Sequence, residues 1–154
     1  MFVEECKKLA PEYPDVLVDD VIVDTMAMRL VRDPQNFDVI VTTNMFGDIL
    51  SDEAAGLVGG LGMAPGLCIG DGDVAMAQAT HGSAPDIAGK GIANPYSMIE
   101  STRMMFDWLG HSRGVPEAVV MAKAITEATT KALANSSART GDINGKGNTQ
   151  SMAN

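Results

Sequence analysis

The sequence is poor in cysteine, aromatic residues and positive charge, and each scarcity excludes a class of protein. Its only cysteines, Cys6 and Cys68, cannot build a disulfide framework, and they favour a reducing compartment. Lysine and arginine number 11 against 20 acidic residues, and the net charge of −9 argues against nucleic acid as a partner. No apolar run is as long as the roughly 18 residues that a membrane helix needs, and no signal-peptide pattern is present. The sequence therefore indicates neither a membrane partner nor secretion.

The rest of the composition is that of a globular chain of 154 residues, with 45% hydrophobic residues. Helical and extended patterns alternate along it, which predicts an α/β fold. Predicted helices cover residues 1–10, 24–34, 47–58, 96–109 and 116–134, and predicted strands cover residues 16–23, 38–43, 67–69 and 74–80. The polar residues 144–154 are predicted to be frayed. Because the chain opens inside a helical pattern without a capping residue, we expect further sequence upstream.

Two carboxylates stand four residues apart in the helix predicted at 47–58, where Asp48 and Asp52 share one face. Like charges at this spacing are mildly destabilising, so we expect a positive partner. Asp24 lies near the start of the preceding helix, and carboxylates of this kind suit a hard cation such as Mg²⁺ or Mn²⁺. An N-cap role for Asp24 and a helix-opening role for Asp48 are the alternative explanations, and spacing alone leaves both open.

The loop "HGSAPDIAGKGIANP" (residues 81–95) has the composition of a ligand cradle. Its glycines let backbone amides approach a phosphate or a ribose closely. Asp86 suits a ribose diol and repels a 2′-phosphate. An ordinary surface loop, with His81 as a helix cap, remains the alternative at this point.

Two glycine-rich strings do not carry the functions that they suggest. "GLVGGLG" (residues 56–62) is not G-x-G-x-x-G, so the Rossmann fingerprint is absent. "IGDGDVAMAQA" (residues 69–79) resembles the acidic metal loop of haloacid-dehalogenase-type phosphatases, which also need an upstream D-x-D-x-T loop. No such loop occurs in this sequence.

Three long motifs together resemble the C-terminal half of the isocitrate/3-isopropylmalate dehydrogenases, which are β-decarboxylating enzymes with an α/β fold of their own. The motifs are "VDTMAMRLV", "FDVIVTTNMFGDILSDEAAGLVGGLGMAPG" and "HGSAPDIAGKGIANP". They occur in the family's order and spacing, and the resemblance covers nearly the whole chain. It implies that residues from about 1 to 50 form small-domain and dimer-interface elements, and that residues from about 51 to 154 return to the cofactor-binding large domain.

The resemblance implies NAD-linked oxidative decarboxylation of a small-molecule 2-hydroxy acid that carries a β-carboxylate. Asp48 and Asp52 would bind Mg²⁺ or Mn²⁺, and Asp24 would complete the metal and substrate site from the partner subunit of a homodimer. NADP-using relatives carry lysine and tyrosine where this chain has Asp86 and Ile87, which implies NAD. The residues that would bind the cofactor are His81, Gly82, Ser83, Ala84, Pro85, Asp86, Ile87, Ala88, Gly89, Lys90, Gly91, Ile92, Ala93 and Asn94.

Departures from the family pattern are also informative. The resemblance places the catalytic tyrosine and lysine and the substrate-binding arginines upstream of Met1, so we predict no catalytic residue in this chain and no turnover by it alone. Gln78 stands where most members have a glutamate, and Ala77 where they have an aromatic residue. A non-catalytic or regulatory subunit, or a half that pairs with a separate chain, therefore stays open.

The substrate signals conflict. Residues 55–66 resemble isocitrate dehydrogenases, whereas residues 44–55 and 81–95 resemble 3-isopropylmalate dehydrogenases. We favour isocitrate, with 3-isopropylmalate next and homoisocitrate or tartrate as further alternatives. The expected location is cytoplasmic, or the mitochondrial matrix in a eukaryote.

Overall fold

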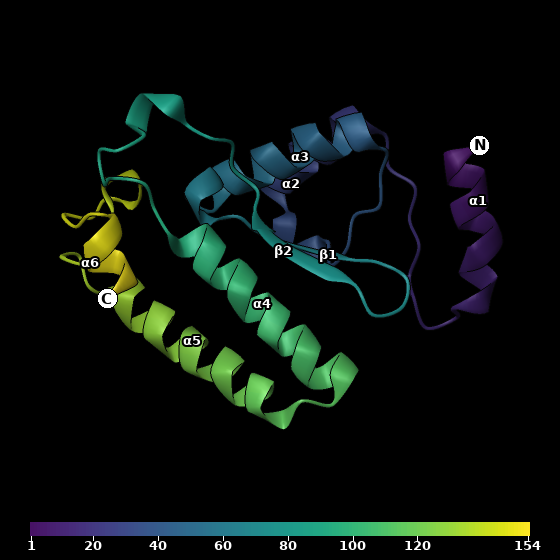
Figure 1. Cartoon of the computed structure of the whole chain (residues 1–154). Coiled ribbons are helices and arrows are strands. Elements are labelled where there is room, and N and C mark those ends of the chain that lie inside the picture. Colours follow the sequence, from purple (N-terminus) through teal and green to yellow (C-terminus); the bar gives the residue numbers. More distant parts are fainter. The chain divides into compact units, whose positions relative to one another are not determined.

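A computed structural model describes all residues, 1–154, and these form two compact units, Met1–Leu57 and Val58–Asn154. Figure 1 shows the course of the chain through both units, which are helical apart from one small sheet. None of the helices combines the length and the apolar character that crossing a membrane requires.

The first unit consists of three helices. They are α1 (Phe2–Leu9), α2 (Val23–Arg32) and α3 (Asn44–Leu57). The core joins α2 to α3, because Met26 and Leu30, one turn apart on α2, pack with Leu50 of α3. Phe37 packs against this cluster, and the Arg29 guanidinium lies 4.6 Å from the centroid of its ring. The three predicted helices of this region are confirmed, although α3 begins three residues earlier than the apolar pattern indicated.

The strands predicted at 16–23 and 38–43 were wrong. A strand needs a hydrogen-bonding neighbour, and no segment of the chain pairs with either stretch. Most of their apolar side chains lie in solvent, with Leu17 96% and Val39 82% exposed, whereas Val21 and Val23 pack against the core of the first unit. An apolar, β-branched run favours a buried strand. It becomes buried only where another part of the protein supplies a surface to pack against.

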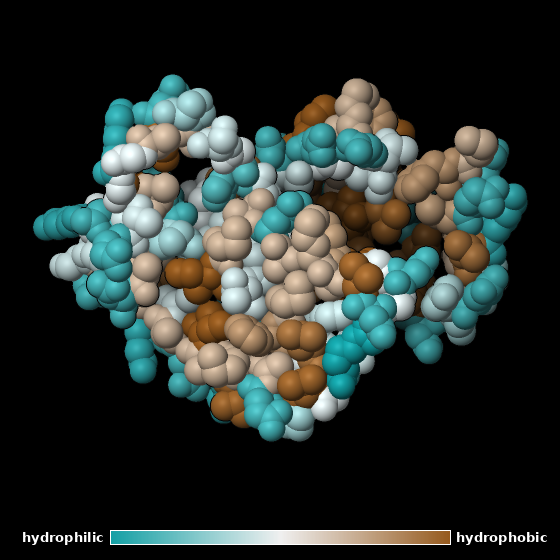
Figure 2. Space-filling view, viewed as in Figure 1, coloured by the Kyte–Doolittle hydropathy of each residue, from teal (hydrophilic) through white to brown (hydrophobic).

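The second unit is a hairpin with helices packed on it. Its elements are β1 (Pro65–Ile69), β2 (Ala75–Ala79), α4 (Tyr96–Arg113), α5 (Pro116–Ala134) and α6 (Thr149–Ala153). The strands are antiparallel and Leu67 pairs with Ala77, so both predicted strands are confirmed. The long α4 packs on the hairpin, and α5 packs on α4 (Figure 1). Apolar residues remain at the surface over α4 and α5, among them Val120 and Met121 (Figure 2).

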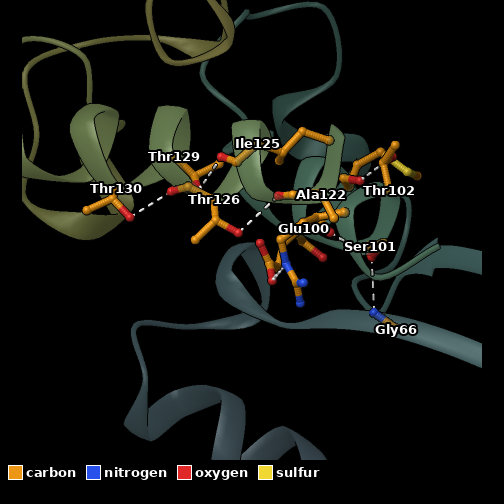
Figure 3. Close-up of polar contacts among 12 residues, drawn as sticks. Gly66, Glu100, Ser101, Thr102, Ala122, Ile125, Thr126, Thr129 and Thr130 are labelled. Carbon is orange, nitrogen blue, oxygen red and sulfur yellow. Dashed lines mark hydrogen bonds and ion pairs between the residues drawn. The ribbon is translucent and has the colours of Figure 1, made fainter. Parts of the chain in front are cut away.

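Two fully buried serines, Ser97 and Ser101, fasten α4 to the hairpin. Figure 3 shows Ser101 at the Gly66 amide. The Ser101 hydroxyl accepts a hydrogen bond from the Gly66 amide at 3.1 Å and lies 2.8 Å from the Gln78 carbonyl oxygen. One turn earlier, Ser97 donates to the carbonyl of Ala64. These bonds satisfy main-chain groups at one end of a two-stranded hairpin that would be marginal by itself.

The predicted helices at 96–109 and 116–134 are confirmed. Pro116 occupies the first turn of α5, where its missing amide hydrogen costs nothing. The predicted fraying at 144–154 was wrong, since this stretch contains α6. Asn148 and Ser151 form a reciprocal capping box, and Met152 is only 5% exposed.

Candidate metal and cofactor sites

The paired carboxylates of α3 are exposed and have no partner within the chain. Asp48 and Asp52 lie one turn apart on a helix that contains three acidic residues and no basic one. Neither carboxylate takes part in any of the seven ion pairs. The one side-chain hydrogen bond at Asp48 is donated by the Ser51 hydroxyl to the main-chain carbonyl of Asp48, not to its carboxylate. The positive partner that the spacing predicts is therefore not supplied by these 154 residues.

The ordinary explanations for these aspartates do not hold. The N-cap of α2 is Ile22, so Asp24 lies inside the first turn and is not the N-cap residue. Its Oδ1 accepts a hydrogen bond of 2.5 Å from the adjacent Thr25 amide. The helix α3 begins at Asn44, which places Asp48 a full turn inside the helix rather than at its opening. Asp48 and Asp52 thus have no capping role, and both exposed carboxylates remain available to an external cation.

The chain by itself does not assemble a complete cage for an ion. No three histidine, cysteine or acidic side chains gather in a metal-binding arrangement, so Asp24 does not join Asp48 and Asp52 within one chain. Two carboxylates on one helical face nevertheless fit Mg²⁺ or Mn²⁺, because these hard cations are commonly held by one or two carboxylates together with water and substrate oxygens.

The segment predicted to bind a cofactor, His81–Asn94, is anchored at its two ends and exposed between them. At its start, the Thr80 hydroxyl donates to the Ala64 carbonyl at 2.8 Å. In the middle, Ala84 adopts a left-handed conformation with φ +41°, and a single 3₁₀ turn follows at Pro85–Ile87. Asp86, in that turn, is exposed, so its carboxylate is accessible to a ligand.

Asn94 differs from the rest of this segment. It is only 8% exposed, and its side-chain amide donates to the Asp142 carboxylate at 3.0 Å. Its side-chain oxygen accepts a hydrogen bond of 2.9 Å from the Tyr96 amide. The side chain is thus occupied within the protein, and the main chain of Asn94 is what a cofactor could contact.

Tyr96 follows directly and is half-buried at the start of α4. Burial raises the pKa of its phenol above the usual 10.0, the nearby charge of Glu100 raises it further, and Arg103 acts in the opposite direction. The phenol is therefore neutral over the physiological pH range.

The sequence reasoning missed Asp142 and Thr149. Thr149 donates from its main chain to the Gly91 carbonyl at 2.9 Å and from its hydroxyl to the Ala93 carbonyl at 2.5 Å. These contacts join residues more than 50 positions apart, so no local pattern could have indicated them. The only available signal was the unusual density of glycine and asparagine between residues 141 and 148.

Comparison with known proteins gives a consistent result along the chain. A family model described as isocitrate/isopropylmalate dehydrogenase matches residues 1–154. An isocitrate/homoisocitrate dehydrogenase from Thermus thermophilus is 60% identical over 110 residues, which are 71% of this chain and 33% of that protein. A 3-isopropylmalate dehydrogenase from Methanothermobacter thermautotrophicus is 48% identical over 153 residues, 99% of this chain and 44% of that protein.

A solved structure of isocitrate dehydrogenase from Methylococcus capsulatus has the same fold over this region. It superposes with a TM-score of 0.88 at 47% sequence identity, covering 99% of this chain and 43% of that one. The α/β fold class expected from the sequence is confirmed by this similarity. The chain spans between a third and somewhat less than half of the length of each of these relatives.

Proposed function

Since the chain belongs to the isocitrate/isopropylmalate dehydrogenase family, we propose that it contributes the metal-binding helix and the cofactor loop to an NAD-linked oxidative decarboxylation. The substrate is a 2-hydroxy acid with a β-carboxylate. The observation that carries this proposal is the exposed pair Asp48 and Asp52, which has neither a cationic partner nor a capping role in the chain.

In this proposal Asp48 and Asp52 hold Mg²⁺ or Mn²⁺, and Asp24 reaches the same ion and the substrate from the partner subunit of a homodimer. When bound, the metal acts as a Lewis acid toward the oxygen of the substrate's hydroxyl-bearing carbon. The large exposed apolar side chains of the first unit, such as Ile22 and Ile49, support a subunit interface there.

The loop His81–Asn94 holds the adenosine part of NAD. The exposed Asp86 favours this assignment, because a carboxylate accepts hydrogen bonds from both ribose hydroxyls and repels the extra phosphate of NADP. The reaction then transfers a hydride from the hydroxyl-bearing carbon to the nicotinamide. The hydroxyl proton is released, CO₂ leaves, and a proton takes its place on the neighbouring carbon.

Isocitrate is the substrate that we favour, as the residues 55–66 resemble those of isocitrate dehydrogenases. A specific observation also supports 3-isopropylmalate, since a relative that carries this name aligns with 99% of the chain. The resemblance places the substrate-binding arginines and the catalytic tyrosine and lysine in the part of the family's longer proteins that precedes the part matched by this chain. We therefore expect no turnover from the 154 residues alone.

The test is a chimera in which this chain replaces the matching 153 residues of the Methanothermobacter relative. We expect reduction of NAD that depends on Mn²⁺ and on either isocitrate or 3-isopropylmalate. Asp48→Asn should lower kcat/KM at least about 100-fold, because a Lewis acid supplies several kcal/mol of transition-state stabilisation. The matched control is Asp71→Asn, an exposed aspartate in the hairpin turn, which should leave the rate unchanged.

A second variant tests the cofactor assignment. Asp86→Lys removes the repulsion of a 2′-phosphate and should shift the ratio of kcat/KM values toward NADP. A folded chimera that binds NAD but turns over neither substrate would contradict the catalytic proposal and favour a regulatory role. An Asp48→Asn chimera with unchanged activity would remove the metal assignment.

A further inference from the structure

The end of the cofactor loop is a junction of three segments that lie far apart in the sequence. The carboxyl-terminal segment runs beside the loop residues that lead into α4 (Figure 1). There Thr149 uses its main-chain amide and its hydroxyl to bind two carbonyls, those of Gly91 and Ala93. A single residue thus holds a stretch of three loop residues at both of its ends.

A side-chain contact reinforces the same junction. The Asp142 carboxylate accepts a hydrogen bond of 3.0 Å from the Asn94 amide, and no cation pairs with it. Its negative charge therefore strengthens that bond. The junction is also closed sterically, since a Cβ on Gly62 would lie 3.0 Å from both the Asn94 Cβ and Asp142 Oδ2.

The segment that carries Thr149 and Asp142 is itself well anchored. Thr140 is fully buried, and its carbonyl accepts a hydrogen bond of 2.9 Å from the Gly145 amide. Side chains at Gly145 and Gly147 would collide with the carbonyls of Arg139 and Ala138, so the chain folds back tightly on itself. Together with the capping box of α6, these contacts make the segment a fixed support rather than a loose tail.

The middle of the cofactor loop has no comparable support. Between Gly82 and Lys90 the hydrogen bonds are local, such as those from Ile87 to the Ala84 carbonyl and from Lys90 to the Ile87 carbonyl. The position of Asp86 therefore depends on the anchors at the two ends, Thr80 and the junction at residues 91–94. A change at either anchor would alter where the loop presents its groups.

We propose that the carboxyl-terminal segment, through Thr149 and Asp142, is the clamp that positions the cofactor loop for binding the dinucleotide. This inference rests on the proposed function for the loop as the NAD site. In this role Thr149 and Asp142 are positioning residues, since they act on a ligand through the carbonyls of Gly91 and Ala93 and the amide of Asn94. Loosening the clamp should weaken NAD binding without any change in the groups that touch NAD.

The first test uses Thr149→Val, which keeps the shape of the side chain and the main-chain amide but removes the hydroxyl. Trypsin cleavage after Lys90 reports opening of the loop next to the clamp, and cleavage after Arg113 is the internal reference. We expect cleavage after Lys90 to accelerate about two- to tenfold, the range set by the loss of one hydrogen bond, while cleavage after Arg113 stays unchanged. The control is Thr130→Val, whose hydroxyl bonds only within its own helix, to Thr126.

The second test uses Asp142→Ala and Asp142→Asn. Asparagine retains an oxygen that can accept from Asn94, so it should restore most of the protection that alanine loses. Unchanged cleavage after Lys90 in both Thr149→Val and Asp142→Ala would overturn the clamp. Recovery in Asp142→Asn would support it, whereas equal cleavage in the alanine and asparagine variants would remove Asp142 from it.

Titration of the same variants with NAD, by calorimetry and in the chimera with the Methanothermobacter relative, separates the two proposals. A Kd for NAD raised about two- to tenfold in Thr149→Val, and unchanged in Thr130→Val, supports the positioning role. Faster cleavage with an unchanged Kd would overturn that role. If the unsubstituted chimera binds no NAD, the assignment of the loop as the NAD site fails, and the cleavage rates alone decide whether the clamp exists.

Discussion

Ser101 is the residue whose removal should most directly weaken the second unit. Its side chain is 0% exposed, and its hydroxyl is the link between α4 and the main chain of both hairpin strands. A hydroxyl donates only one hydrogen bond, so the carbonyls of Gln78 at 2.8 Å and Ser97 at 2.7 Å compete for it. The Gly66 amide, at 3.1 Å, depends on the lone pairs of the same oxygen.

The magnitude follows from these contacts. Ser101→Ala removes the fully buried hydroxyl that bonds the Gly66 amide and the Gln78 carbonyl, and the loss of such a buried hydrogen-bonding group costs about 1–3 kcal/mol. Alanine is the better helix former and offsets about 0.5 kcal/mol. We therefore expect a free energy of unfolding lower by about 1–2 kcal/mol.

Urea unfolding measures this change through the fluorescence of Trp108, the only tryptophan, which lies on the same helix. The control is Thr102→Ala, because the exposed hydroxyl of Thr102 bonds only to Met98 on its own helix and its loss should cost nearly nothing. A loss in Ser101→Ala no greater than in Thr102→Ala would refute the claim that the buried serine fastens α4 to the hairpin.

Three further outcomes test other parts of the structure. A Cβ on Gly110 would collide with Val119 of α5, so Gly110→Ala should lower thermal stability by about 1–3 kcal/mol, and Val119→Ala in the same chain should recover part of it. Folding raises the pKa of Tyr96 above 10.0. The neutral phenol's contribution to stability is therefore complete below pH 10.0 and is lost as the pH rises through the folded-state pKa. The free energy of unfolding measured against pH should show this loss in the unsubstituted chain and not in Tyr96→Phe. Asp52→Asn removes a like charge one turn from Asp48, so it should raise the metal-free unfolding free energy by about 0.2–0.5 kcal/mol in chemical denaturation, whereas no change or a loss would mean that the pair does not repel.

The helices were predictable because their signals are local. The boundaries of α5 at Pro116 and Ala134 follow from a proline suited to the first turn and from a run of strong helix formers. The same local rules place Asp48 and Asp52 on one face of α3. What a local pattern does not contain is the identity of the partner, and this is why the strands predicted at 16–23 and 38–43 do not form in the chain.

The junction at the end of the cofactor loop was unpredictable for a related reason. Asn94 fits equally well as an exposed ligand-binding residue or as a buried one, and its contact with Asp142, 48 residues away, decides between them. Likewise, the polar composition of residues 144–154 predicts fraying until the capping box and the buried Met152 give the segment a stable fold. At Asn94 and in residues 144–154, the hydrogen bonds and packing of the folded chain determine the structure, and local composition does not predict them.

The most direct test of the central claim is the binding of Mn²⁺ to the chimera with the Methanothermobacter relative, measured by the loss of the electron paramagnetic resonance signal of the free ion. We expect the unsubstituted chimera and its Asp71→Asn control to bind Mn²⁺ alike, and Asp48→Asn and Asp52→Asn each to abolish this binding. Mn²⁺ binding that persists unchanged in Asp48→Asn and Asp52→Asn would contradict the assignment of the α3 carboxylates as the metal site.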